Sequence, residues 1–186
     1  CCSHAAFLNA AAASCFGGCS ADGHAGHWPD ADMLPIGPLL QDYDKSIRTK
    51  FTEDEQITMM TLWSIFRSPL MIGGEMTGFD EFTMSLLTNE GILAMHSNAR
   101  HSHQVWKKEI GGVEHILWTA ACSEGGQYIA VFNTGDKASE IDISLADVEI
   151  YGGVTATELW SGETVAVDKA VSVKLNSHGA KAFLLK

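Results

Sequence analysis

The chain has 186 residues, of which 46% are hydrophobic and 19% are charged, and its formal net charge is -11. This composition is typical of a globular protein with one ordinary domain or two small ones, and it excludes a disordered chain. No apolar run approaches the roughly 18 to 20 residues of a membrane-spanning helix, and the negative charge argues against nucleic acid and anionic membranes as partners.

The N-terminal part of the chain is rich in small residues. Residues 2–14 are dominated by alanine, the strongest helix former, and predict a short helix. The five cysteines are an odd number crowded toward the N-terminus, which is not a disulfide framework. Cys15 and Cys19 are followed by His24 and His27, but this spacing fits no standard zinc site. We therefore expect free thiols here, and no bound metal or cofactor.

The segment His27–Gly37 gathers acidic, aromatic and proline residues and is the strongest candidate for a binding site. Pro29 and Pro35 restrict the backbone and favour a stiff, extended strand end. On an extended chain, Asp30 and Asp32 lie on one side because they are two positions apart. The residues alone leave a second interpretation open, in which both carboxylates cap turns around the prolines.

A polar loop is expected at Gln41–Lys50, followed by a helix from Glu53 to about Arg67. Thr52 and Glu55 form a capping box at the start of that helix. Its apolar residues form a broad stripe that predicts burial between a sheet and another element. These residues are Met59, Leu62, Trp63 and Phe66, widened by Ile57, Met60 and Ile65.

Two further elements complete a strand, helix, strand, helix order. Pro69–Gly74 is a short apolar run that is typical of a buried parallel strand, and a second helix is expected from Phe79 to Thr88, with Asn89 and Gly91 near its end. This order is the repeating unit of an α/β fold. Two such units cannot cover both faces of a sheet by themselves.

The last part of the chain predicts an antiparallel β-sandwich. The polar stretch from His96 to Gln104 contains three histidines and is interpreted as a linker, the alternative being a set of metal ligands. Beyond it the hydrophobic period is two, with one buried and one exposed face, and glycine-rich turns separate the segments. The expected strands are Val105–Glu109, His115–Ala121, Gln127–Asn133, Glu140–Leu145, Val154–Trp160, Glu163–Val167, Ala170–Leu175 and Ala180–Leu185.

The candidate site segment matches a known motif. Residues Trp28–Gly37 resemble the pattern Gly-Trp-x-Asp-Pro-Asp-Met-Leu-x-Ile-Gly, with His27 and Ala31 as departures. This pattern is found in α-galactosidases of glycoside hydrolase family 27, which belongs to clan D together with α-N-acetylgalactosaminidases.

Two other blocks extend the resemblance over residues 23–98. Thr52–Gly73 is similar to the helix and strand that follow the motif in the family, and Leu86–Asn89 is similar to its last barrel helix. The family continues with Asn-Gln-Asp where this chain has His96-Ser97-Asn98, so the role of that loop is not carried over. The chain as a whole resembles the C-terminal part of these enzymes.

The resemblance implies an α+β fragment, in which residues 1–103 are the last βα units of a (β/α)8 barrel and residues 104–186 are an all-β antiparallel sandwich. It implies that Asp32, Met33 and Trp28 contribute to substrate binding: Asp32 accepts hydrogen bonds from sugar hydroxyls and Met33 packs beside the sugar. Asp30 supports the site from behind, together with Trp28. The partner is thus a carbohydrate, a terminal α-linked galactose-type sugar.

The resemblance also implies that this chain holds no catalytic residue. Retaining hydrolysis needs a nucleophile and an acid/base carboxylate about 5 to 5.5 Å apart. In the family these come from barrel strands four and six, which would precede Cys1. The fragment alone is therefore expected to be inactive, and its unpaired barrel edges are expected to favour self-association.

Two alternative functions remain open at this stage. Residues 104–186 can be a sugar-binding or purely structural module, for which Trp106 is the one candidate exposed aromatic because Trp118 and Trp160 lie within strand patterns. Alternatively, Asp30 and Asp32 can be the metal-binding or acid/base pair of an unrelated enzyme, which predicts activity in this chain alone.

Overall fold

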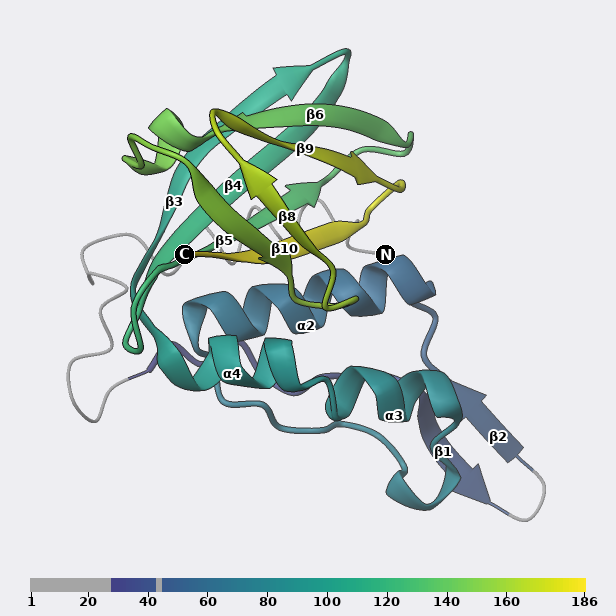
Figure 1. Cartoon of the computed structure of the whole chain (residues 1–186). Coiled ribbons are helices and arrows are strands. Elements are labelled where there is room, and N and C mark those ends of the chain that lie inside the picture. Colours follow the sequence, from purple (N-terminus) through teal and green to yellow (C-terminus); the bar gives the residue numbers. More distant parts are fainter. Residues whose placement is uncertain (1–27, 43–44) are drawn as a thin grey trace.

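A computed structural model describes residues 28–42 and 45–186 of the chain. The helix expected over residues 2–14 and the Cys15, Cys19, His24 and His27 grouping lie outside the described residues. The structure is mostly an antiparallel β-sandwich with few helices beneath it (Figure 1).

Its helices are α2 (Glu53–Phe66), α3 (Glu81–Leu87) and α4 (Glu90–Asn98), with short 3-10 turns η1 (Met76–Gly78) and η2 (Leu145–Val148). Its strands are β1 (Pro38–Asp42), β2 (Lys45–Arg48), β3 (Ala99–Ile110), β4 (Val113–Cys122), β5 (Gln127–Asn133), β6 (Ser139–Ser144), β7 (Val154–Glu158), β8 (Thr164–Val167), β9 (Ala170–Leu175) and β10 (Ala180–Leu185).

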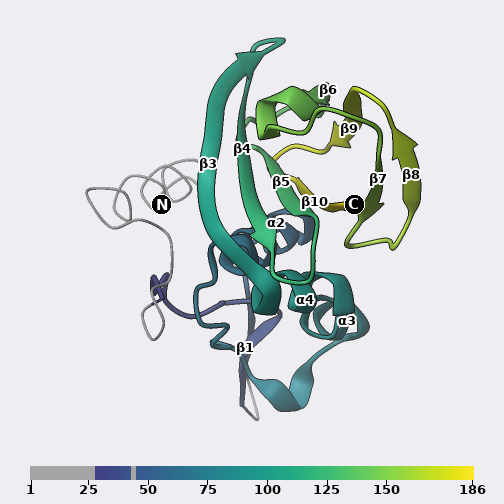
Figure 2. The ribbon, with the colours of Figure 1, turned by 60° about the vertical axis from the view of Figure 1, so that its left-hand side comes forward.

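The sandwich consists of a large sheet and a small one. The large sheet has six strands in the order β3-β4-β5-β10-β7-β8, and β6 pairs with β9 in a separate two-stranded sheet. All of these pairings are antiparallel. Figure 2 shows how the large sheet curves from the long β3–β4 hairpin around to β7 and β8, with β6 and β9 across from it. The predicted antiparallel sandwich is therefore confirmed.

The central strands of the large sheet are buried on both faces. Leu117, Ile129 and Val131 point toward the β6–β9 sheet, whereas Trp118 and Phe132 belong to a second core shared with α2 and α4. The prediction of one buried and one exposed face is confirmed for β6 and β9, whose side chains alternate in burial. It is wrong for β4 and β5, because the helices cover the face that would otherwise meet water.

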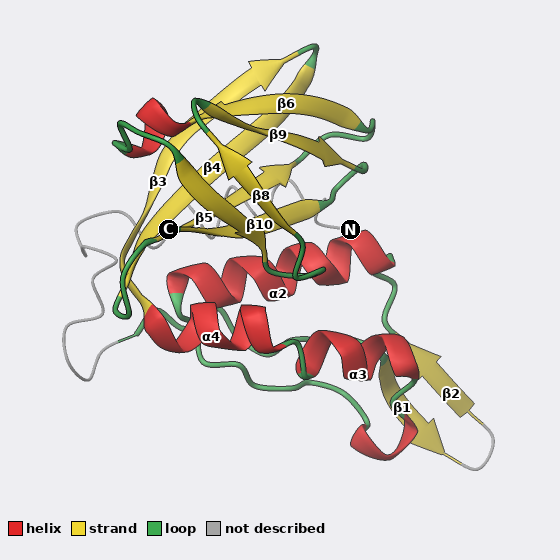
Figure 3. Ribbon diagram, in the orientation of Figure 1, coloured by secondary structure: helices red, strands yellow, loops and turns green. Residues whose placement is uncertain are grey.

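Helix α2 forms the middle layer of the molecule. It lies between the large sheet and α4 (Figure 3), as the broad apolar stripe predicts. The capping box of Thr52 and Glu55 is present, and Arg67 ends the helix in the left-handed conformation. Full burial of a side chain such as Met60 or Ile65 stabilises the fold by about 1.5 to 3 kcal/mol. None of the described helices is long and apolar enough to cross a membrane.

Three predicted connections have a different structure. The expected loop Gln41–Lys50 contains the second half of a hairpin formed by β1 and β2. The predicted helix before Asn89 is α3, but Asn89 also caps the start of a further helix, α4, because its side chain accepts a hydrogen bond from the amide of Ile92. The expected linker from His96 to Gln104 is instead the end of α4 joined directly to β3.

Candidate functional site

The candidate site segment has the parallel neighbour that the sequence predicts. Leu34 forms a parallel bridge with Ile72, in which the Leu34 amide donates to Met71 O at 2.7 Å and the Gly73 amide donates to Leu34 O at 2.9 Å. The pairing is an isolated bridge and not the full strand expected over Pro69–Gly74.

The two faces of this parallel pair differ in burial. Leu34 and Ile36 are fully buried against α2 and its neighbours. Met33 and Met71, by contrast, are 51% and 50% exposed. Gly73 lies under Met33, because a Cβ atom placed on this glycine would be 3.1 Å from the Met33 Cβ. Strands in parallel sheets are normally covered on both faces. This pair differs, because only its Leu34 and Ile36 face is covered.

Asp32 sits at a backbone kink in the segment. Its φ of 70° is in the left-handed region, which aspartate tolerates better than most residues. The predicted extended strand end is therefore interrupted at Asp32. The conformation is held from α2, because the Trp63 indole donates to Asp32 O at 2.9 Å. The Ala31 amide donates to the Ser68 hydroxyl at 3.0 Å and fixes the preceding residue.

Both carboxylates of the segment are exposed and take part in its turns. The Asp32 amide donates to Asp30 Oδ1 at 2.9 Å, and the Met33 amide donates to Asp32 Oδ1 at 2.7 Å. Within the described part of the chain, Asp32 Oδ2 makes no hydrogen bond, so it is able to accept one from a ligand. The structure thus brings Asp30, Asp32 and Met33 together in one solvent-facing turn.

Trp28 lies in a neighbouring shallow cleft of about 370 Å³, which it lines with Arg67, Pro69, His96 and Ser97. The indole is 47% exposed, and the Arg67 guanidinium carbon is 5.7 Å from the centre of its ring. Arg67 Nε also donates to His96 O at 3.2 Å. Asp32 and Met33 do not line this cleft, so the structure places Trp28 beside the acidic turn and not within it.

Two residues of this cleft were not found by sequence reasoning. Arg67 was assigned only to the end of a helix, and His96 to a linker. Burial lowers the pKa of His96 and the nearby Arg67 charge lowers it further, while the hydrogen bond between His96 Nε2 and Ser68 O opposes both effects. Burial and the Arg100 charge likewise lower the pKa of Arg67. Arg67 and His96 are 29 residues apart in the chain, and no motif or spacing in the sequence predicts that they contact each other.

The sandwich aromatics are engaged in contacts of their own. Trp118 is buried, and the half-buried Trp160 donates its indole N–H to Thr61 Oγ1 at 3.0 Å. Trp106 donates to Asp147 Oδ2 at 2.8 Å, and Lys108 Nζ lies 4.6 Å from the centre of its ring. The described residues contain no cluster of three or more His, Cys, Asp or Glu side chains able to hold a metal ion.

Comparison with known proteins identifies the sandwich. Residues 112–185 match the family described as the α-galactosidase C-terminal β-sandwich domain. The structure resembles that of a family 27 β-L-arabinopyranosidase from Geobacillus stearothermophilus in complex with arabinose, with a TM-score of 0.85, 38% identity, and coverage of 98% of this chain and 41% of that chain. It also resembles that of a putative α-N-acetylgalactosaminidase from Bacillus halodurans, with a TM-score of 0.77, 35% identity, and coverage of 87% of this chain and 40% of that chain.

A curated relative supports the same relationship. Alpha-galactosidase D of Emericella nidulans is 28% identical over 155 residues, which are 83% of this chain and 22% of that protein. The chain therefore spans between a fifth and two fifths of the length of these relatives. The fold and the family match therefore define residues 112–185 as a β-sandwich domain of the α-galactosidase C-terminal type. More particularly, the chain as a whole is similar to the C-terminal part of α-galactosidase-like proteins of family 27.

Proposed function

We propose that the helical part of this chain is the end of a (β/α)8 barrel, so that residues 1–103 are the barrel remnant and residues 104–186 the sandwich. The parallel bridge between Leu34 and Ile72 and the intervening helix α2 support this assignment, because together they make one βαβ unit. The exposed side chains of Met33 and Met71 support it further, since the interior of a complete barrel would bury them.

We further propose that the whole protein is a retaining glycoside hydrolase acting on terminal α-linked galactose-type sugars. A β-L-arabinopyranose ring carries its hydroxyls in the same arrangement as an α-galactopyranose ring and lacks only the hydroxymethyl group, so the names of the relatives point to one ring configuration. The observation that carries the proposal is the Asp32 turn, whose free carboxylate oxygen is presented to solvent on a rigid support.

The side chains of the turn then have distinct roles. Asp32 Oδ2 accepts a hydrogen bond from a ring hydroxyl, and Met33 packs against the carbon face of the sugar. Asp30 holds the Asp32 amide, and Trp28 supports the segment from its neighbouring cleft. Asp30 and Asp32 are bonded into one turn and do not face each other across a sugar, as a retaining pair must. We therefore place the nucleophile and the acid/base group outside this chain, which alone does not hydrolyse glycosides.

The test is a chimera in which this chain replaces the matching C-terminal part of the Geobacillus enzyme. Nitrophenyl α-D-galactopyranoside and nitrophenyl β-L-arabinopyranoside are the substrates. We expect the chimera to hydrolyse at least one of them, and Asp32→Asn to lower kcat/KM about a hundredfold, because a charged hydrogen bond to the sugar is lost. The exposed carboxylate of Asp142 on β6 provides the control, and Asp142→Asn should leave kcat/KM unchanged. Hydrolysis by the 186-residue chain alone, or full activity of the Asp32→Asn chimera, would overturn the proposal.

The exposed apolar side chains of the proposed barrel remnant also support self-association of the isolated chain. Most of the large exposed hydrophobic residues in the described structure fall between residues 28 and 84. They are Trp28, Met33, Leu40, Ile47, Met71, Met76 and Met84, against Ile110, Tyr151 and Val165 in the rest. A second copy of the chain covers this surface when the other barrel units are absent.

A further inference from the structure

Helix α2 is hydrogen-bonded along one face to strand β3, to the loop after β7 and to the turn between β9 and β10. The four contact positions are 54, 58, 61 and 65, and their spacing of four, three and four residues keeps them on one side of the helix. The contacts are Asn176 Nδ2 to Asp54 Oδ1 at 3.1 Å, Thr58 Oγ1 to His178 O at 2.7 Å, Trp160 Nε1 to Thr61 Oγ1 at 3.0 Å, and Ser102 Oγ to Ile65 O at 2.5 Å.

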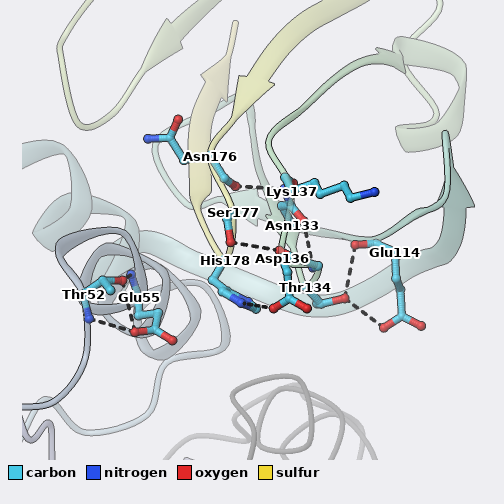
Figure 4. Close-up of polar contacts among 11 residues, drawn as sticks. Thr52, Glu55, Glu114, Asn133, Thr134, Asp136, Lys137, Asn176, Ser177 and His178 are labelled. Atoms are coloured by element: carbon cyan, nitrogen blue, oxygen red, sulfur yellow. Dashed lines mark hydrogen bonds and ion pairs between the residues drawn. The ribbon is translucent and has the colours of Figure 1, made fainter.

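The turn between β9 and β10, which supplies two of these contacts, is itself braced (Figure 4). Asn133 Nδ2 donates to Asn176 O at 2.8 Å, and Ser177 Oγ donates to Gly135 O at 3.3 Å. His178 Nε2 lies 2.9 Å from Asp136 Oδ1. The turn therefore belongs to the rigid end of the sandwich, and it presents fixed polar groups to the first turns of α2.

The loop that carries Trp160 is fixed in a similar way. The buried carboxylate of Glu158 accepts hydrogen bonds from the amides of Trp160 at 3.1 Å and Ser161 at 2.8 Å. Asn89 Nδ2 donates to Trp160 O at 3.1 Å and ties the loop to the start of α4. The indole that bonds to Thr61 thus comes from a loop with little freedom to move.

The other side of α2 holds the candidate binding segment. Trp63, two residues after Thr61, donates its indole N–H to Asp32 O, and Gln56 Oε1 accepts the Gly37 amide at 3.0 Å. Thr61 is fully buried, and its hydroxyl donates to Ile57 O while accepting from Trp160. Leaving a buried hydroxyl without its hydrogen-bond partner costs free energy. The bond between Thr61 and Trp160 therefore fixes how α2 is rotated about its axis and where it lies along the sandwich.

We propose that the sandwich positions Asp32 through α2, and that Thr61 and Trp160 are the positioning residues. The part of this inference that concerns sugar binding depends on the proposed function, in which Asp32 binds the substrate. The mechanical part does not depend on it. In this arrangement the C-terminal sandwich supports the binding site through α2 and is not an independent module. Displacement of α2 moves the Trp63 indole, whose N–H donates to the Asp32 carbonyl oxygen and holds Asp32 in its left-handed conformation.

The experiment follows the Trp63 indole N–H by NMR in the ¹⁵N-labelled full chain, with the signal assigned by its loss in Trp63→Phe. Trp160→Phe removes the contact with Thr61 but keeps an aromatic ring in the loop. We expect it to raise the hydrogen-exchange rate of the Trp63 indole about tenfold, the change that accompanies loss of one buried hydrogen bond. Trp106→Phe is the matched control, because it removes an indole contact with Asp147 elsewhere in the sandwich. It should leave the Trp63 exchange rate unchanged.

A second pair of variants covers the case in which Trp160→Phe does not fold. Thr61→Val keeps the shape of the side chain and loses the hydroxyl, whereas Thr61→Ser keeps the hydroxyl. Faster Trp63 exchange in Thr61→Val, with normal exchange in Thr61→Ser, supports the positioning role. Equal exchange rates in Trp160→Phe and Trp106→Phe, or in the two Thr61 variants, would overturn it. The exchange measurement needs no sugar. It therefore tests whether the sandwich positions Asp32 independently of whether Asp32 binds a sugar, which the chimera tests.

Discussion

The indole nitrogen of Trp63 donates a hydrogen bond across 2.9 Å to the carbonyl oxygen of Asp32, 31 residues earlier in the chain. This bond joins the middle of the molecule to its candidate binding turn. It orients a residue whose backbone is in a sparsely populated conformation, with a φ of 70°. The orientation of the Asp32 side chain is therefore set by contacts to its backbone. Of its two carboxylate oxygens, Oδ1 accepts from the Met33 amide, and Oδ2 is left for a ligand.

The left-handed conformation of Asp32 predicts a graded response to substitution. Asp32→Asn should change the free energy of unfolding by less than about 0.5 kcal/mol, because asparagine tolerates this conformation equally well. Asp32→Val should destabilise the chain by about 1 to 2 kcal/mol, since a β-branched residue is strained there. Urea unfolding of both variants tests this expectation, and a Val variant as stable as the Asn variant would contradict it.

Asp80 predicts a loss of stability in acid. It caps α3, and the hydrogen bond from the Thr83 amide, assisted by Arg48, lowers its pKa to about 2. A carboxylate with a lower pKa in the folded state stabilises the fold above its ordinary pKa, and this contribution disappears as the pH falls from about 4 to 2. Asp80→Asn should flatten the pH dependence of stability in that window. Glu81→Gln, a neighbouring exposed carboxylate, is the control and should retain the wild-type dependence.

The sandwich was predictable from sequence because its physics is local. Short apolar segments between glycine-containing or polar turns gave the bounds of β5, β9 and β10 without error, and the capping box located the start of α2. The β1–β2 hairpin was missed because its directly paired apolar residues Leu40 and Ile47 are both exposed, so they give no sign of a buried strand face. Helix α4 was missed because asparagine favours both ends of helices, so Asn89 was assigned only to the end of the preceding helix and not also to the start of the next.

The candidate site was predictable only in part. The acidic turn of Asp30 and Asp32 stands out by composition, but its support comes from groups far away along the chain. Trp63 reaches Asp32, and Trp160 reaches Thr61 across 99 residues. Such contacts have no periodicity or spacing that a single sequence reveals. They follow from the packing of α2 between two layers, which is a property of the whole fold.

His115 predicts a second pH dependence, in the neutral range. Burial lowers its pKa, and its Nε2 lies 2.7 Å from Ser139 Oγ. A histidine with a lower pKa in the folded state binds its proton more readily when unfolded, so stability should fall as the pH drops below about 6.5. His115→Gln should reduce this slope in thermal unfolding between pH 7 and pH 5. His103→Gln, at an exposed position on β3, should not.

The exposed methionines of the proposed barrel remnant predict concentration-dependent association. Met33 and Met71 lie on adjacent, hydrogen-bonded segments, and about half of each side chain is exposed. We expect the isolated chain to sediment faster as its concentration rises, and the double substitution Met33→Lys and Met71→Lys to shift it toward the monomer, because two charges cannot be buried against an apolar partner. Tyr151→Lys replaces a more exposed apolar residue, 85% exposed, within the sandwich and should have no effect. If Tyr151→Lys disrupts association as strongly as the methionine pair, or if the wild-type chain is monomeric at every concentration, the surface of the barrel remnant is not the contact.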